Sequence, residues 1–118
     1  MKNLAPHLTR QRLLIEALYS IEVDQPLIEN YFSRLTKSLG LKAYSKPIIF
    51  SPGGEGKEVN QGYDAFIPLI DSEISLYVWT STKFLSVVIY TCKAFDVPIA
   101  LKVTQEFFKA KTVEHMSF

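Results

Sequence analysis

Two stretches of the chain carry the hydrophobic pattern of an amphipathic helix behind an Asp-x-Pro start. In the first, Asp24 can cap the helix and Pro26 lies in its first turn, where a missing N–H costs nothing. Apolar residues follow at helical spacing. The second stretch repeats the arrangement at Asp96 and Pro98, with apolar residues four positions apart behind it. The pattern predicts two helices, over residues 26–39 and 98–109.

The rest of the chain has the pattern of extended structure. Apolar and aromatic runs between polar turn residues predict strands over residues 12–23, 43–50, 63–70, 74–79, 85–92 and 112–118. Four glycines with charged neighbours make residues 51–62 a loop, long enough to act as a lid over a site. We write the order as β-α-β-β-β-α-β, a meander whose two helices can cover one face. It predicts a single α/β (α+β) domain, residues 1–118, built as a two-layer α/β sandwich.

Composition excludes several classes of protein. The 118 residues suit one domain, and 47% apolar with 21% charged residues is typical of globular proteins. A net charge of +1 without a basic stripe argues against nucleic acid or a membrane as partner. We find no signal peptide and expect a cytoplasmic protein, in which the single cysteine, Cys92, stays reduced. One cysteine and two distant histidines predict no metal site.

The glycine loop does not fit a phosphate-binding motif. A P-loop needs a glycine, four residues, and then Gly-Lys-Ser/Thr. Here Gly56-Lys57 has Ser51 in place of the first glycine, and Glu58 follows the lysine. A mobile hairpin connection is the simpler interpretation.

Single residues also allow plain structural interpretations. Taken alone, Ser72 is typical of a turn and Cys92 of a buried small apolar residue. Neither has a histidine nearby in the sequence to activate it as a nucleophile. Ser75, Tyr77 and Trp79 share one strand face, a stripe more typical of a core or a dimer interface than of a ligand platform.

The order of motifs in residues 50–92 changes this picture. Phe-Ser-Pro-x-Gly begins at Phe50, Asp-Ser-Glu-Ile-Ser-Leu-Tyr-Val-Trp begins at Asp71, and Tyr-Thr-Cys ends at Cys92, twenty residues after Ser72. This order resembles the small bacterial and archaeal S-adenosylmethionine decarboxylases. They carry a Phe-Ser-Pro-x-Gly turn, a Glu-Ser-His-x-Ser-x-His-x-Trp-Pro-Glu segment and Phe-Thr-Cys-Gly. The resemblance covers nearly the whole chain, with an expanded loop at residues 53–62.

The resemblance implies a chemistry for the two candidate catalytic residues. The hydroxyl of Ser72 would attack the preceding carbonyl, the chain would split there, and the serine would become a pyruvoyl cofactor. Its ketone binds the substrate amine and withdraws electrons as carbon dioxide leaves. Cys92 aligns with the family's proton-donating cysteine, a role that needs an accessible thiol. The family acts in polyamine (spermidine) biosynthesis.

At four positions where the family has residues that support self-cleavage, this chain has a different residue. Tyr77 replaces the processing histidine five residues after Ser72, and Glu73 replaces the histidine directly after it. Asp64 aligns with a supporting serine eight residues before the cleavage serine, and Asp71 replaces a glutamate. A phenol transfers protons at neutral pH less readily than an imidazole does. We therefore predict that the purified protein is mostly uncleaved at the Asp71–Ser72 bond.

The resemblance also implies substrate-binding positions at Phe50, Ile74 and Ser81. Ser81 falls where the family has a glutamate that resembles a ribose anchor, and a serine is shorter and uncharged. Three hypotheses follow: a working S-adenosylmethionine decarboxylase, the same chemistry on another amino-acid substrate, or an unprocessed binding or regulatory relative. We further expect a homodimer, because two helices cover only one sheet face, and we expect Ser72 and Cys92 to lie close together.

Overall fold

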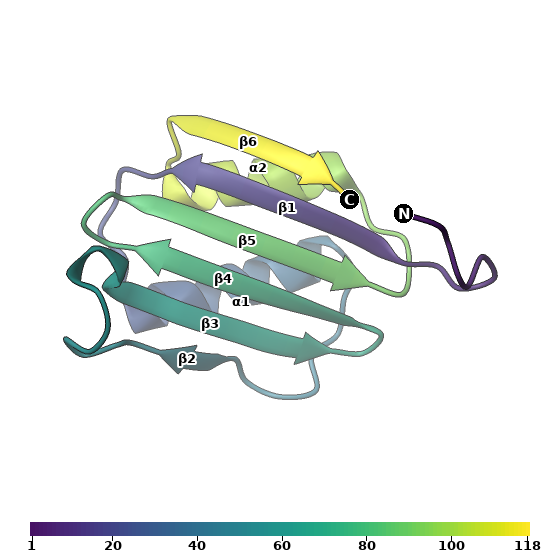
Figure 1. Cartoon of the computed structure of the whole chain (residues 1–118), viewed down its shortest axis with the longest axis horizontal. Helices are drawn as coiled ribbons and strands as arrows, with labels where there is room; N and C mark the ends of the chain where they lie inside the picture. The colour runs from purple at the N-terminus through teal and green to yellow at the C-terminus, as the bar shows by residue number, and fades with distance from the viewer.

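The computed structural model describes residues 1–118 and has two layers, a six-stranded antiparallel sheet and two helices packed on one of its faces (Figure 1). This confirms the predicted two-layer α/β architecture. The elements in chain order are β1 (Gln11–Leu18), α1 (Gln25–Ser38), β2 (Ile48–Phe50), the 3₁₀ turn η1 (Glu58–Asn60), β3 (Gly62–Leu69), β4 (Ser72–Trp79), β5 (Phe84–Thr91), α2 (Val97–Phe108) and β6 (Thr112–Ser117).

The sheet has the strand order β2-β3-β4-β5-β1-β6. Strands β2 to β5 follow one another as a meander, and β1 fills the place between β5 and the last strand, β6. Four strands separate the two helices, so the β-α-β-β-β-α-β order written from the sequence is one strand short. The edges of the sheet are the short β2 and the C-terminal β6.

Both helices begin where the Asp-x-Pro pattern predicts. The Asp24 carboxylate accepts a hydrogen bond from the Leu27 N–H at 2.9 Å, and the Asp96 carboxylate accepts one from the Ile99 N–H at 3.2 Å. Each bond satisfies a backbone donor that the first helical turn leaves free. These caps fix the starts of α1 and α2 against the sheet.

Two strand predictions are wrong in length. The first strand ends at Leu18 and not at residue 23. Tyr19 still donates its N–H to the Lys83 carbonyl at 2.8 Å, in register with the β1–β5 pairing, but the Ser20 N–H bonds to the Phe108 carbonyl of α2 at 3.4 Å. The strand predicted over residues 43–50 is reduced to Ile48–Phe50, with only an isolated bridge from Ala43. Pro47 directly precedes the short strand and has no N–H to give to a ladder.

The predicted loop also ends earlier than expected, because Gly62 is the first residue of β3. A Cβ atom at this position would lie 1.8 Å from the Val78 carbonyl oxygen on the neighbouring strand. No side chain fits there, so the close approach of β3 to β4 depends on glycine.

The core lies between the helices and the sheet. Alternate side chains of the strands face the helices, among them Ile74, Leu76 and Val78 of β4, all of them buried. Between the helices, the Tyr31 hydroxyl and the Thr104 hydroxyl are hydrogen-bonded at 2.8 Å. Burial raises the pKa of Tyr31, which keeps this hydroxyl protonated.

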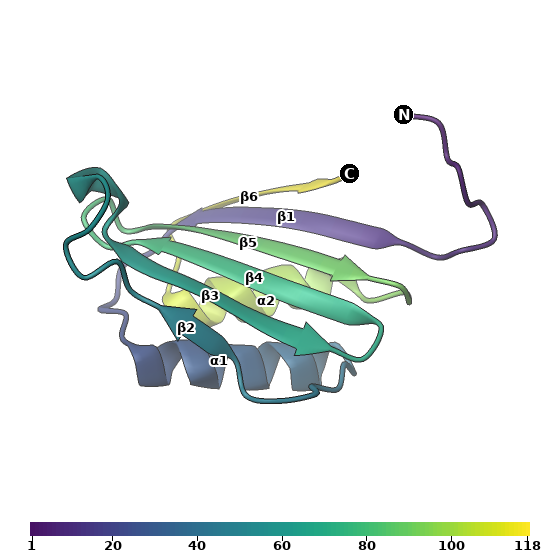
Figure 2. The same cartoon turned by 60° about the horizontal axis from the view of Figure 1, so that its bottom comes forward.

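The second face of the sheet, here named the open face, carries no helix (Figure 2). Ser75, Tyr77 and Trp79 lie on it, as the alternation along β4 predicts. Exposed apolar side chains from both edges of the sheet lie on the same face, including Ile48 of β2 and Met116 of β6.

Candidate functional site

Ser72 and Cys92 lie together at one end of the sheet. Ser72 begins β4 and pairs with Thr91, the last residue of β5, so that Cys92 follows directly beside it. A cavity of about 330 Å³ is lined by Asp71, Ser72, Glu73, Tyr90 and Cys92. The antiparallel pairing of β4 with β5 therefore joins two residues that are twenty positions apart.

The peptide bond before Ser72 has an unusual setting. Asp71 has a φ of 61°, in the left-handed region that non-glycine residues adopt at an energetic cost, although aspartate tolerates it better than most. Its carbonyl oxygen accepts a hydrogen bond from the backbone N–H of Cys92 at 2.6 Å. A donor on a carbonyl stabilises the negative charge that develops when a nucleophile adds to it.

The hydroxyl oxygen of Ser72 is buried and has no hydrogen-bond partner. Buried hydroxyls in folded proteins almost always have one. This oxygen is therefore free of any bond that would hold it away from the adjacent Asp71 carbonyl carbon.

Cys92 has an exposed thiol, and no disulfide restrains it. Accessibility is what proton donation to a bound molecule requires. The interpretation of Cys92 as a buried apolar residue is therefore wrong.

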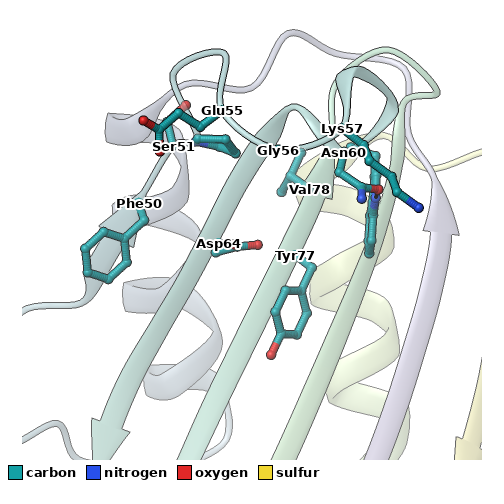
Figure 3. Close-up of a pocket in the computed structure, with 11 residues that line it drawn as sticks. Phe50, Ser51, Glu55, Gly56, Lys57, Asn60, Asp64, Tyr77 and Val78 are labelled. Carbon is teal, nitrogen blue, oxygen red and sulfur yellow. Dashed lines mark hydrogen bonds between the residues drawn. The ribbon is translucent and has the colours of Figure 1, made fainter.

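Tyr77 and Asp64 lie at the opposite end of the sheet, where they face each other on β4 and β3. They line a second cavity of about 560 Å³ beneath the glycine loop (Figure 3), together with residues that the sequence had not singled out for a site: Ser51, Pro52, Glu55, Gly56, Lys57, Asn60, Val78 and Trp79, as well as Phe50. The loop is held by Gln61, whose side chain accepts from the Gly54 N–H at 2.9 Å and donates to the Glu55 carbonyl at 2.8 Å.

Within one protomer, Tyr77 is too far from Ser72 to act on it. Five residues of extended strand span about 17 Å, and an odd separation places the two side chains on opposite faces. The structure thus brings Asp71, Glu73 and Cys92 to Ser72, and leaves the Tyr77–Asp64 pair elsewhere.

Residues 14–118 match the protein family described as S-adenosylmethionine decarboxylase. The chain belongs to that family. The match covers nearly the whole sequence, which confirms the resemblance identified from its motifs. The family is in general pyruvoyl-dependent, and the motif serine and cysteine of this member are the two residues that meet at the Ser72 end of the sheet.

The fold agrees with this membership. The crystal structure of the adenosylmethionine decarboxylase from Aquifex aeolicus superposes with a TM-score of 0.72 at 16% sequence identity, covering 94% of this chain and 89% of that one. A search of the curated protein sequences finds no match.

The substrate positions implied by the S-adenosylmethionine decarboxylase family are divided in the structure. Phe50 is 65% exposed and lines the cavity with Tyr77. Ser81 is exposed in the connection between β4 and β5. Ile74 is fully buried among the core residues under the helices and offers no surface to a substrate.

Tyr90 is a site residue that sequence reasoning missed. It is paired with Glu73 across β4 and β5 and lines the Ser72 cavity. Its position two residues before Cys92, on the same strand face, is the signal that could have identified it. No cluster of three or more His, Cys, Asp or Glu side chains could hold a metal ion, and neither helix has the length and apolarity to cross a membrane.

Proposed function

We propose that this member of the family cleaves itself slowly at the Asp71–Ser72 bond and acts as a pyruvoyl-dependent decarboxylase. Its substrate would be S-adenosylmethionine, in polyamine (spermidine) biosynthesis, or a related amino acid. The observation that carries the proposal is the Cys92 N–H bonded at 2.6 Å to the Asp71 carbonyl, beside the unpartnered Ser72 hydroxyl.

The cleavage would proceed in two stages. The Ser72 oxygen adds to the Asp71 carbonyl carbon, the hydroxyl proton passes to the leaving nitrogen, and the amide becomes an ester. Loss of the Ser72 α-proton then breaks the Cβ–O bond, which frees an Asp71 carboxylate and leaves a double bond at residue 72. Addition of water and release of ammonia yield the pyruvoyl group. Every atom comes from the chain or from one water molecule.

The pyruvoyl group supplies an electron sink for decarboxylation. At position 72 it would be surrounded by Glu73, Tyr90 and Cys92, which share the cavity with Ser72. The exposed Cys92 thiol is suited to return a proton to the substrate carbon, and Glu73 to attract the amine.

Cleavage would be slow because the side chains expected to assist it, Tyr77 and Asp64, lie far from Ser72 within one chain. Tyr77, where the family has a histidine, lies with Asp64 in the other cavity. If the two assist Ser72, they must come from a second chain. We therefore propose a homodimer packed through the open face, in which the second chain would reach Ser72 at the end of the sheet, through the cavity that Ser72 shares with Glu73 and Tyr90. This packing would also cover the exposed apolar side chains of the open face.

A second candidate function is an unprocessed relative that binds or regulates a partner, for example an active homologue. The Tyr77 phenol in place of the family's histidine favours it, because a phenol transfers protons at neutral pH less readily than an imidazole does. The single free cysteine fits a cytoplasmic location for either function.

Carbon dioxide release tests the proposed activity. Protein incubated until fragments form should release it from S-adenosylmethionine or from one member of a panel of α-amino acids, and phenylhydrazine, which blocks ketones, should abolish the release. Ser72→Ala is the matched control and should be inactive. If the cleaved protein releases carbon dioxide from none of them, the decarboxylase is refuted and the regulatory relative is favoured.

A further inference from the structure

The side chain of Gln11, the first residue of β1, makes two hydrogen bonds to a single residue far along the chain. Its Nε2 donates to the Phe95 carbonyl at 2.9 Å, and its Oε1 accepts from the Phe95 N–H at 2.9 Å. Phe95 lies in the connection between β5 and α2, outside both elements. The carboxamide therefore satisfies both backbone groups of a residue that belongs to no strand or helix.

Gln11 also belongs to the row of residues that ends the sheet beside Ser72. It pairs directly with Thr91 of β5, and Thr91 pairs directly with Ser72 of β4. Directly paired residues lie on the same face of a sheet, so these three polar side chains form one row across three strands. The chain leaves the sheet immediately after Thr91, and the next residue is Cys92.

Residues 92–95, here named the Cys92 turn, are held at both ends. At the start, the hydroxyl of the fully buried Thr91 donates a hydrogen bond to the Lys93 carbonyl. At the end, Gln11 holds the backbone of Phe95, and the Phe95 side chain is buried in the core. Fixing both ends of so short a segment leaves few conformations to the residues between them.

Both contributions of Cys92 to the site depend on the geometry of this turn. Its backbone N–H donates to the Asp71 carbonyl at 2.6 Å, and its side chain lines the cavity beside Ser72. A hydrogen bond weakens steeply as its angle departs from linear, so a rotation of the turn would weaken the bond to Asp71. Groups that act in catalysis must likewise be held within about 0.5 Å of their productive position.

We propose that Gln11 is a positioning residue for the Ser72 site: its carboxamide holds the Cys92 turn so that both the N–H and the thiol of Cys92 stay in place. Gln11 does not itself line the Ser72 cavity, and it acts through the backbone of Phe95. This inference rests on the self-cleavage and decarboxylation proposed above. The alternative is that Gln11 only ties the connection before α2 to the sheet, which would affect the stability of the fold and not the geometry of Cys92.

Amide hydrogen exchange, measured by NMR, tests the positioning role directly. Gln11→Met removes the carboxamide and keeps an unbranched side chain of similar length. In a Ser72→Ala chain, which cannot cleave during the measurement, it should speed exchange at Cys92 and Phe95 by about ten- to hundredfold, the range expected when two hydrogen bonds are lost. Gln105→Met, the same change at an exposed position of α2, is the control and should leave exchange at Cys92 unaltered.

Activity gives a second measurement, made in chains that keep Ser72. Gln11→Met should slow self-cleavage about tenfold, because the Cys92 N–H no longer stays on the Asp71 carbonyl that gains negative charge. In the chains that have cleaved, kcat for carbon dioxide release should fall and KM should stay within about twofold, because the thiol returns a proton and does not bind the substrate. Gln11→Ala should behave in the same way, since it removes the same two hydrogen bonds.

The two measurements separate this inference from the proposed function. Unaltered exchange at Cys92 in both Gln11 variants would overturn the positioning role, even if their melting temperatures fall. Faster exchange with wild-type rates of cleavage and of carbon dioxide release would overturn it as well. If the wild type neither cleaves nor releases carbon dioxide, the proposed function fails, and exchange at Cys92 still decides whether Gln11 holds the turn. Circular dichroism identifies a variant that has lost its fold, and the other Gln11 variant then decides.

Discussion

A Tyr77→His substitution is expected to raise the rate of self-cleavage at Asp71–Ser72 by about 10²–10⁴-fold, the usual contribution of general acid–base catalysis. An imidazole gains and loses a proton near neutral pH, whereas a phenol ordinarily keeps its proton there. The Cys92 amide already supports the carbonyl that Ser72 attacks. Proton transfer to the leaving nitrogen is therefore the step that lacks a catalytic group. Gel electrophoresis over time measures how much faster the variant chain cleaves than the wild type.

Two companion variants locate this effect. Tyr77→Phe keeps the ring and should give no acceleration. A Ser72→Ala/Tyr77→His chain cannot cleave itself, yet mixed with wild-type chains it should accelerate cleavage of the wild type if the imidazole acts across the dimer. Acceleration confined to chains that carry both Ser72 and His at 77 would contradict the shared site.

Replacing Cys92 by alanine should separate self-cleavage from decarboxylation. Alanine keeps the backbone N–H that bonds to the Asp71 carbonyl, so fragments should still form at the wild-type rate. It removes the exposed thiol, and carbon dioxide release per cleaved chain should fall by about 10²-fold or more if the thiol donates the proton. Cys92→Ser should recover part of the loss. Unchanged release from the alanine variant would assign proton donation to Tyr90 or water.

Local chemistry made much of the fold predictable. The Asp24 and Asp96 caps identified both helix starts, and alternation along β4 assigned its two faces correctly. The predictions failed where tertiary contacts override the local hydrophobic pattern. The apolar run from residue 12 to residue 23 predicted one long strand, but the Ser20 N–H bonds to the Phe108 carbonyl of α2 and the strand ends at Leu18. The position of β1 between β5 and β6 depends on long-range pairing that no local pattern encodes.

The sequence predicted that Ser72 and Cys92 meet, but it did not predict where Tyr77 and Ile74 lie. A short connection between adjacent strands was enough to bring Ser72 beside Cys92. Motif alignment grouped Tyr77 with the same serine, although their odd separation on one strand already places them on opposite faces. Ile74 was likewise assigned to substrate binding from the family motif, in which it lies two residues after Ser72. Its side chain is on the buried face of β4. Alignment thus identified residue types, and geometry decided which of them meet.

The mass of the intact protein, followed over time, tests the central claim that Ser72 is a slow cleavage serine. Freshly purified protein should be mainly one species at 13.4 kDa. Incubation should convert it to residues 1–71 and a second fragment that begins at position 72, lacks a free amino group and carries a ketone. Complete cleavage during purification would contradict the claim that cleavage is slow. The absence of any such fragment, in the wild type and in Tyr77→His alike, would contradict the claim itself.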